Sequence, residues 1–183
     1  MIPFISGLDV GVLQYLYTQR DITISLSFIG ITELGSTVFV CGVAVCIGLV
    51  LAVRHKVLYA IALGISVLGA GATALLVKEA VRRARPERAL QAYQETGFSF
   101  PSGHATLAAA FYGFLIYLVW RMMPPGLART ATVSALALLI ALISFSRLYL
   151  GVHYLSDVVG GILLGGLFVW IGILVVKRIA KQD

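Results

Sequence analysis

Residues 154–176 read YLSDVVGGILLGGLFVWIGILVV, and every residue after Asp157 in this run is apolar or glycine. An α-helix needs about 20 such residues to cross the hydrocarbon core of a bilayer. Because backbone N–H and C=O groups must be paired inside the bilayer, we interpret this run as a transmembrane helix. It carries Gly160, Gly161, Gly165 and Gly166, whose spacing lets helices pack closely in lipid.

Four further apolar runs precede this one, at roughly residues 34–53, 57–77, 105–120 and 131–145. The composition agrees, since 60% of residues are hydrophobic, 12% are charged and the mean hydropathy is +0.97. Soluble domains have about 45–50% apolar and about 25% charged residues. We therefore predict an all-α integral membrane protein, a helical bundle of about five to six transmembrane helices that forms one domain over residues 1–183.

The first 33 residues are apolar but are interrupted by five polar or charged residues, Asp9, Gln14, Arg20, Asp21 and Glu33. We predict N-terminal interfacial helices here, short helices that lie along the membrane surface with Val10, Leu13 and Tyr17 facing lipid. The alternative is a tilted sixth span over residues 8–31, which the charged pair at its centre makes costly.

Five spans divide the connections between two sides of the membrane. The N-terminus, the loop over residues 78–100 and the turn over residues 146–153 share the first side. The fourteen Lys and Arg residues divide equally between the two sides. If Lys78, Arg85 and Arg147 are assigned to a site, the second side has the excess of positive charge. The positive-inside rule then predicts that the second side is cytoplasmic and the first side is the outer face.

Three polar clusters lie on the first side, each near the end of a predicted helix. The first is K-x6-R-P over residues 78–86, the second is PSGH over residues 101–104, and the third is S-R-x5-H-x3-D over residues 146–157. The clusters are far apart in the sequence, but helix ends on one side of a bundle can meet. We predict that they share one pocket at the membrane surface.

His153 and Asp157 are four residues apart, so they share one face of a helix. A carboxylate in this position accepts a hydrogen bond from one imidazole nitrogen, which leaves the other nitrogen free to attack. We predict that His153 is a nucleophile and that Asp157 orients it. The alternative is a polar pair that only bridges a helix and a loop.

Ser102, Gly103 and His104 stand at the start of a predicted span. A helix N-terminus offers unpaired N–H groups to a phosphate, and Gly103 allows the backbone to approach closely. Ser102 is predicted to cap the helix or to donate to a phosphate oxygen. His104 is placed to protonate a leaving alkoxide as general acid. A helix cap beside an interfacial histidine is the alternative.

Lys78, Arg85 and Arg147 are predicted to hold phosphoryl oxygens and to stabilise charge in the transition state. Three other arginines, Arg82, Arg83 and Arg88, are interpreted as contacts to lipid headgroups or as charge at the membrane surface. Ser146 fits either a helix cap or a phosphate contact.

The three clusters, in this order and with these gaps, resemble the type 2 phosphatidic acid phosphatase (PAP2) superfamily, which also contains the vanadium haloperoxidases. The resemblance covers residues 78–157. It implies a membrane lipid phosphatase that hydrolyses a phosphomonoester or diphosphate headgroup through a phosphohistidine intermediate. Phosphatidylglycerophosphate, phosphatidic acid and undecaprenyl diphosphate are the substrates it implies. Many membrane members carry an additional first span, so the first 33 residues depart from the family pattern.

We predict that the reaction needs no metal or other cofactor, because two-metal phosphatases use several carboxylates and the motifs contain only Asp157. The predicted partners are a lipid phosphate substrate and a bacterial inner or plasma membrane, with no nucleic acid. The alternatives are a vanadate-dependent haloperoxidase-like enzyme and a non-enzymatic lipid-binding or transport protein. The oligomeric state stays open, because glycine-rich faces suit a dimer as well as internal packing.

Overall fold

The computed structural model describes residues 3–179, and helices are the only regular secondary structure within that range. The elements are α1 (Pro3–Thr18), α2 (Ile22–Glu33), α3 (Thr37–Val53), α4 (Val57–Val81), the 3-10 helix η1 (Arg88–Leu90), α5 (Gly103–Met122), α6 (Leu127–Tyr149) and α7 (Leu155–Ile179). Within the described residues, five stretches are long and apolar enough to cross a membrane: Ile22–Val53 and the helices α4, α5, α6 and α7. The predicted all-α membrane bundle is therefore confirmed.

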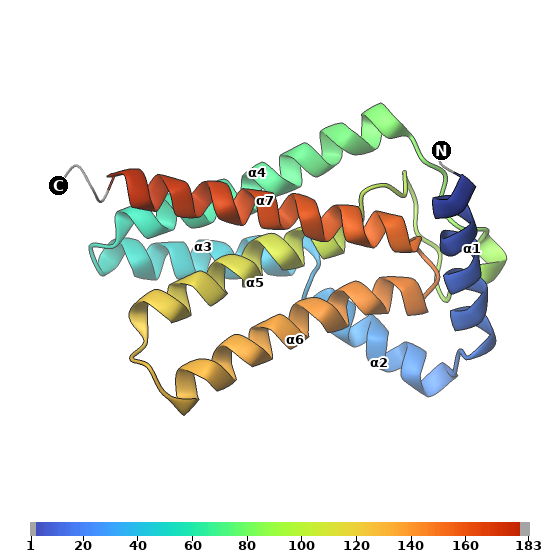
Figure 1. Cartoon of the computed structure of the whole chain (residues 1–183), viewed down its shortest axis with the longest axis horizontal. Coiled ribbons are helices and arrows are strands. Elements are labelled where there is room, and N and C mark those ends of the chain that lie inside the picture. The colour runs from blue at the N-terminus through green and yellow to red at the C-terminus, as the bar shows by residue number, and fades with distance from the viewer. Residues whose placement is uncertain (1–2, 180–183) are drawn as a thin grey trace.

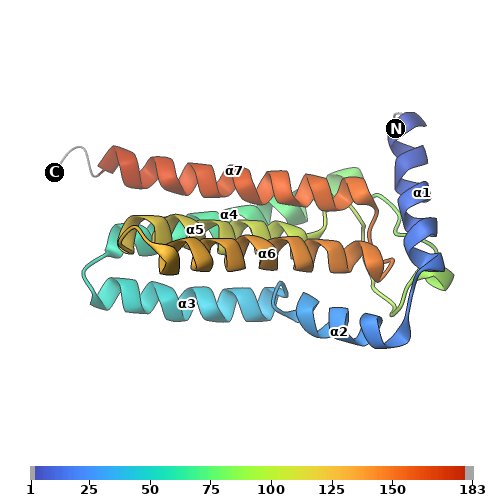
Figure 2. The same ribbon diagram turned by 60° about the horizontal axis from the view of Figure 1, so that its bottom comes forward.

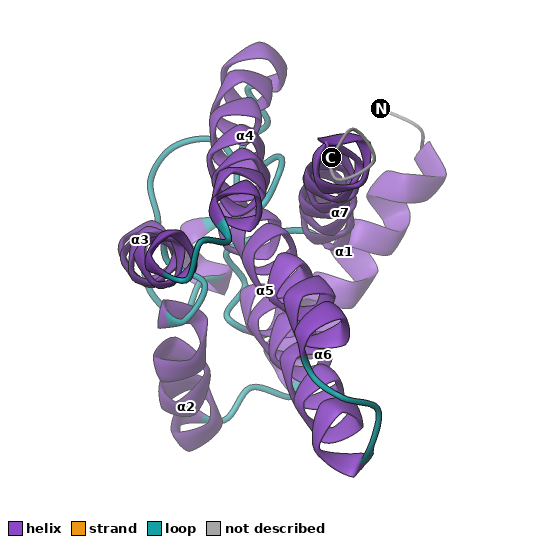
Figure 3. Cartoon of the chain, turned by 90° about the vertical axis from the view of Figure 1, so that its left-hand side faces the viewer, coloured by secondary structure: helices purple, strands orange, loops and turns teal. Residues whose placement is uncertain are grey.

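Helix α5 lies at the centre of the bundle. Figure 3, which looks along the long helices, shows it between α4, α6 and α7, and it packs against all three. Buried residues occupy most of its length, and Ala108, Phe111 and Phe114 are at most 1% exposed. The outer faces of the surrounding helices carry exposed apolar side chains such as Leu68 and Leu163, as expected for contact with lipid.

Two glycines of α7 set its close approach to α5. A Cβ atom on Gly165 would lie 2.5 Å from the carbonyl oxygen of Thr106, and one on Gly161 would lie 2.7 Å from that of Ser102. No larger residue fits at either position without moving α5. The predicted packing role is thus confirmed for this pair, whereas Gly166 faces open space.

The N-terminal segment agrees only partly with the prediction. Helix α1 lies across one end of the bundle, as an interfacial helix would, but α2 runs in line with α3 (Figure 2). Helix α2 packs beside α6, and a break at Gly35 and Ser36 separates it from α3. Ser36 caps α3 by accepting a hydrogen bond from the backbone N–H of Phe39. The first candidate span is therefore a broken helix.

The prediction that Leu13 faces lipid is wrong. Val10 and Tyr17 are each 44% exposed, as predicted, but Leu13 is only 5% exposed. Leu13 lies one helical turn after the buried Asp9, so both side chains are on the face of α1 that packs against α6 and α7.

The two ends of the bundle are as the sequence predicts. Figure 1 shows α1, the loop that follows α4 and the turn between α6 and α7 at one end. The turn between α3 and α4 and the connection between α5 and α6 lie at the other end. All three motif clusters are consequently at the end that carries α1.

Candidate active site

Asp157 lies in the first turn of α7, but His153 lies in the turn before that helix, so the prediction that both share one helix face is wrong. Both residues are buried, with exposures of 2% for His153 and 0% for Asp157. Nδ1 of His153 is 3.5 Å from Oδ2 of Asp157. The same oxygen accepts hydrogen bonds from the backbone N–H of Tyr154 and from the hydroxyl of Ser99. The other ring nitrogen, Nε2, lies 3.2 Å from Nη1 of Arg85. The carboxylate of Asp157 therefore faces Nδ1 of His153, and Nε2 faces the guanidinium of Arg85.

The ring of His153 is held in its neutral form. The pKa of His153 is lowered from the ordinary 6.5 to about 4, and burial is the strongest influence. The hydrogen bond to Asp157 opposes this shift, and the positive charges of Arg147 and Arg85 contribute to it. A neutral ring at pH 7 has a free lone pair, which a nucleophile requires.

Arg85 and Arg147 converge on one carboxylate that the sequence analysis did not single out. Nη1 of Arg85 lies 2.6 Å from Oε2 of Glu95, and Nη2 of Arg147 forms a short ion pair with Oε1. Nε2 of His153 is 4.0 Å from Oε2. Burial opposes ionisation of this carboxyl, but the two arginines outweigh it and lower the pKa of Glu95 to about 2. The two cations and the histidine nitrogen thus surround one anion position.

Three further residues predicted to bind phosphate, Lys78, Ser102 and Gly103, lie at the end of α4 and the start of α5. Nζ of Lys78 donates to the carbonyl of Phe98 and is close enough to Glu95 and Asp157 to sense their charges. Ser102 makes no side-chain cap, and its buried Oγ has no hydrogen-bond partner among the described residues. The hydroxyl is therefore free to donate to a ligand. Gly103 is the first residue of α5.

His104 follows in the first turn of α5 and is partly buried. It is close enough to Arg147, Glu95 and His153 to sense their charges. All eight predicted site residues therefore lie at one end of the bundle, in the region where α4, α5, α6 and α7 meet the loop over residues 82–102.

The interpretation of Arg83 as a headgroup contact is wrong. Its guanidinium lies 2.6 Å from Oδ1 of Asp157, 2.7 Å from Oδ2 of Asp9 and 2.6 Å from the hydroxyl of Ser156. A buried carboxylate needs such a partner, because an unpaired charge is costly in the interior. Arg83 thereby joins α1 to the first turn of α7.

Arg82, Arg88 and Ser146 take no part in the site. Arg82 is on the surface, where its side chain is 69% exposed and forms a long 3.9 Å ion pair with Glu79. Arg88 is also exposed. The hydroxyl of Ser146 donates to the carbonyl of Ile143 within its own helix, so it neither caps the helix end nor faces the anion position.

Several site residues were missed by the sequence analysis. Glu95, Ser99 and Tyr93 all precede the PSGH motif, and Tyr93 donates to Glu95 while its oxygen accepts from Arg147. No regular spacing marks these residues. Asp9 could have been recognised, because a single carboxylate in an apolar helix indicates that a buried cationic partner is present.

An apolar groove of about 360 Å³ leads from the membrane-spanning part of the bundle toward the site. It lies between α3, α4 and α5, and Val67, Gly71, Leu75 and Leu107 are among the residues that line it. Lys78 and Gly103 also line it, so the groove reaches two of the residues predicted to bind phosphate.

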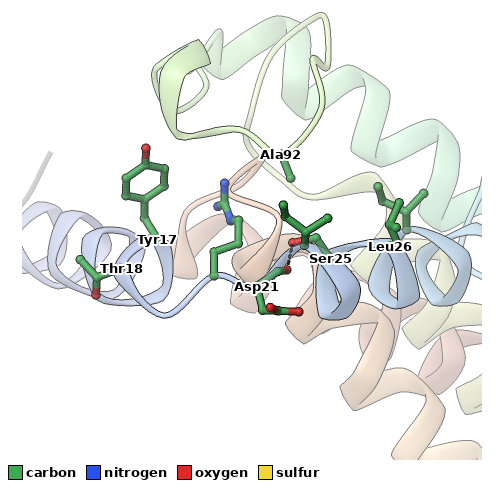
Figure 4. Close-up of a pocket in the computed structure, with 9 residues that line it drawn as sticks. Tyr17, Thr18, Asp21, Ser25, Leu26 and Ala92 are labelled. Atoms are coloured by element: carbon green, nitrogen blue, oxygen red, sulfur yellow. Dashed lines mark hydrogen bonds between the residues drawn. The ribbon is translucent and has the colours of Figure 1, made fainter.

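A second cavity, of about 580 Å³, lies at the joint between α1 and α2 (Figure 4). Tyr17, Arg20 and Asp21 line it together with apolar residues of α2 and with Ala92. None of the predicted site residues lines this cavity, so we do not include it in the candidate active site.

Comparison with known proteins agrees with the resemblance seen in the motifs. Residues 57–181 match the PAP2 superfamily. Phosphatidylglycerophosphatase B of Bacillus subtilis is 36% identical over 140 residues, which cover 74% of this chain and 67% of that protein. Decaprenylphosphoryl-5-phosphoribose phosphatase of Mycolicibacterium smegmatis is 38% identical over 104 residues, which cover 55% of this chain and 51% of that protein.

The fold has a solved counterpart. The crystal structure of a transmembrane PAP2-type phosphatidylglycerolphosphate phosphatase from Bacillus subtilis matches with a TM-score of 0.88 and 26% identity. The match covers 97% of this chain and 88% of that one. The chain belongs to the PAP2 superfamily. It is an integral membrane protein of the lipid phosphate phosphatase class, which the comparisons favour over the haloperoxidase-like and transport alternatives.

Proposed function

We propose that this chain removes a phosphoryl group from a lipid phosphomonoester or diphosphate through a phosphohistidine on Nε2 of His153. One observation carries the proposal. Arg85, Arg147 and this nitrogen surround a single anion position close to the end of an apolar groove. A lipid whose chain lies in the groove would present its headgroup phosphate to that position.

In the first chemical step, Nε2 of His153 attacks phosphorus, and the bond from phosphorus to the lipid oxygen breaks. His104 protonates the departing oxygen, which is an alkoxide for a phosphomonoester and a phosphate oxygen of the lipid for a diphosphate. The guanidinium groups of Arg85 and Arg147 stabilise the charge on the phosphoryl oxygens. In the second step a water molecule attacks the phosphohistidine, and His104 accepts the proton of that water. Inorganic phosphate and the free histidine are the products.

Asp157 would hold the attacking ring in position, since its carboxylate lies beside Nδ1. Ser102 and the first N–H groups of α5 would add donors for the phosphoryl oxygens, because the Ser102 hydroxyl and a helix N-terminus are both unoccupied donors. Lys78 would contribute a further positive charge.

The reaction is proposed to need no metal ion. The carboxylates around the site are Asp9, Asp157 and Glu95, and each is bound to an arginine. Among residues 3–179, no group of three or more metal-binding side chains is clustered. Arginines would therefore do the work that metal ions do in two-metal phosphatases.

Phosphatidylglycerophosphate is the first substrate to test, because two of the similar proteins are named for hydrolysing it. Phosphatidic acid and undecaprenyl diphosphate present the same terminal phosphate on a lipid. We place the site on the outer face of a bacterial membrane, because that leaves the larger number of basic residues outside the site on the cytoplasmic side.

The test is phosphate release by the purified protein in detergent with EDTA present, using these three lipids. His153→Ala should lose all activity, while His55→Ala, an exposed substitution in the turn between α3 and α4, should keep it. If the normal protein is inert on all three lipids, or if His153→Ala retains its activity, the proposed function is wrong.

A further inference from the structure

The Glu95 carboxylate lies where a phosphoryl group would bind. Its Oε2 is 2.6 Å from Nη1 of Arg85 and its Oε1 is paired with Nη2 of Arg147. Carboxylate and phosphoryl oxygens accept from guanidinium groups with similar geometry. A phosphoryl group attacked by Nε2 of His153 must approach this same position, because Nε2 is only 4.0 Å from Oε2.

The two anions cannot both occupy the position. Arg147 is 0% exposed, and its other terminal nitrogen, Nη1, already donates to Thr32 and Tyr93. Nε of Arg147 has no hydrogen-bond partner among the described residues, so a ligand that binds the edge formed by Nε and Nη2 must displace Glu95 from Nη2. The fully buried guanidinium explains why a carboxylate fills the position at all, since an unpaired buried charge is costly.

Glu95 is attached in a way that allows displacement. It lies in the irregular segment between η1 and α5, and no helix depends on its side chain. Its backbone N–H is fixed by the side chain of Gln91, and its own side chain is 19% exposed. Rotation about side-chain bonds can therefore move the carboxylate toward solvent while the backbone stays in place.

We propose that Glu95 sets the affinity that a ligand needs in order to bind, because it competes with every ligand for the anion position between Arg85 and Arg147. Phosphomonoester and diphosphate headgroups displace it, whereas the singly charged phosphodiester headgroups of ordinary phospholipids do not. This inference rests on the proposed function, because it concerns the same anion position.

The physical basis is competition within one molecule. The carboxylate competes equally with every anion, so it weakens all of them by the same factor and leaves only strong ligands able to bind. A phosphomonoester carries close to two negative charges at pH 7, whereas a phosphodiester carries one. Ordinary phospholipids greatly outnumber any lipid phosphate in a membrane. Without the Glu95 carboxylate, their headgroups would therefore occupy the cationic site.

The first experiment measures binding of inorganic phosphate to the full chain in detergent, by calorimetry and without lipid substrate. Glu95→Gln removes the charge and keeps the shape of the side chain. It should bind phosphate at least about tenfold more tightly than the normal protein, as close charge pairs are worth this much or more. Glu87→Gln, an exposed substitution in the same loop, should bind it as the normal protein does.

The second experiment adds phosphatidylglycerol, a phosphodiester lipid, to mixed micelles in the phosphatase assay. It should inhibit Glu95→Gln and leave the normal protein unaffected. If Glu95→Gln binds phosphate no more tightly than the normal protein, or if phosphatidylglycerol inhibits both equally, Glu95 is only a structural counter-ion and the inference is wrong.

A second variant covers the case in which Glu95→Gln does not fold. Glu95→Asp keeps the counter-charge, but its shorter side chain cannot reach both guanidinium groups, so it too should bind phosphate more tightly. Unchanged binding by that variant would contradict the inference. Because phosphate binding is measured without turnover, it separates this inference from the proposed function, which would fail alone if the protein bound phosphate but hydrolysed no lipid.

Discussion

Oδ1 of Asp157 lies 2.6 Å from the guanidinium of Arg83, which stands at an unspecified position of the K-x6-R-P motif. The other oxygen of Asp157 faces Nδ1 of His153. One buried carboxylate therefore connects the proposed nucleophile to Arg83, and through Arg83 to Asp9 on α1.

Replacing Arg83 by alanine should lower kcat by about 10-fold to 100-fold with little change in KM, the loss typical of groups that orient a reacting side chain from behind. Arg83 contacts Asp157 but not the anion position, so substrate binding should be largely kept. Arg83→Lys should restore part of kcat.

Arg82→Ala is the matched control for this change, because Arg82 is the preceding residue and its side chain is 69% exposed. We expect its kcat and stability to equal those of the normal protein. Equal kcat values for Arg83→Ala and Arg82→Ala would mean that Arg83 has no positioning role.

The ring of His153 should stay neutral down to unusually low pH. Its pKa is lowered by burial to about 4, whereas an unfolded histidine titrates near 6.5. The unfolded chain therefore binds the proton first, and the contribution of His153 to folding stability is lost as the pH falls from 6.5 to about 4. Nuclear magnetic resonance of ¹⁵N-labelled histidine, assigned with His153→Ala, measures the pKa directly.

The Arg85→Gln variant tests the sign of the electrostatic effect on the pKa of His153. The positive charge of Arg85 lowers the pKa of His153, so its removal should raise that pKa. Titration of His153 near 6.5 in the unmodified protein would contradict the burial and the charges described for the site.

Filling the apolar groove should affect long-chain substrates selectively. Gly71 lines the groove, and a Cβ at this position meets only Leu107, at 3.5 Å. Gly71→Leu should raise KM for a long-chain phosphatidic acid several-fold and leave a short-chain, water-soluble analogue unchanged. Gly42→Leu is the control, because Gly42 is exposed on α3, does not line the groove and has open space around its Cβ position. An equal effect of Gly71→Leu on both substrates would exclude the groove as a chain-binding site.

The contact between α5 and α7 provides a test of the fold itself. Gly165→Leu places a side chain against the backbone of α5 and should destabilise the protein by about 1–3 kcal/mol or more. Gly166→Leu enters open space and should leave the melting temperature nearly unchanged. Equal melting temperatures for the two variants would show that the helices do not pack at Gly165 in solution.

The parts of this protein that could be predicted from sequence depend on local pattern. Each predicted span is a continuous apolar run, and the residues of each motif are close in the chain, so the contact between His153 and Asp157 follows from their spacing. The contact is made across the turn before α7 and not along one helix face, because α7 begins only at Leu155. That the motifs lie together follows from counting membrane crossings. Leu13 was mispredicted because its neighbours in space come from α6 and α7, which no local pattern identifies.

The charged residues around the motifs could not be predicted for the same reason. Arg82 and Arg83 are adjacent and chemically identical, yet one is exposed and the other is bound to two buried carboxylates. Which of them points inward is decided by the irregular path of the chain after α4. Glu95 is likewise selected by the fold, since only the bundle brings Arg85 and Arg147 to the two sides of its segment.

The bridge from Asp9 through Arg83 to Asp157 has a consequence for biosynthesis. Its three residues belong to the first helix, the loop after α4 and the last helix of the described chain. A ribosome delivers them to the membrane in that order, so Arg83 has one of its two carboxylate partners until α7 is inserted. The proposed centre is therefore incomplete until α7 joins the helices that are made before it.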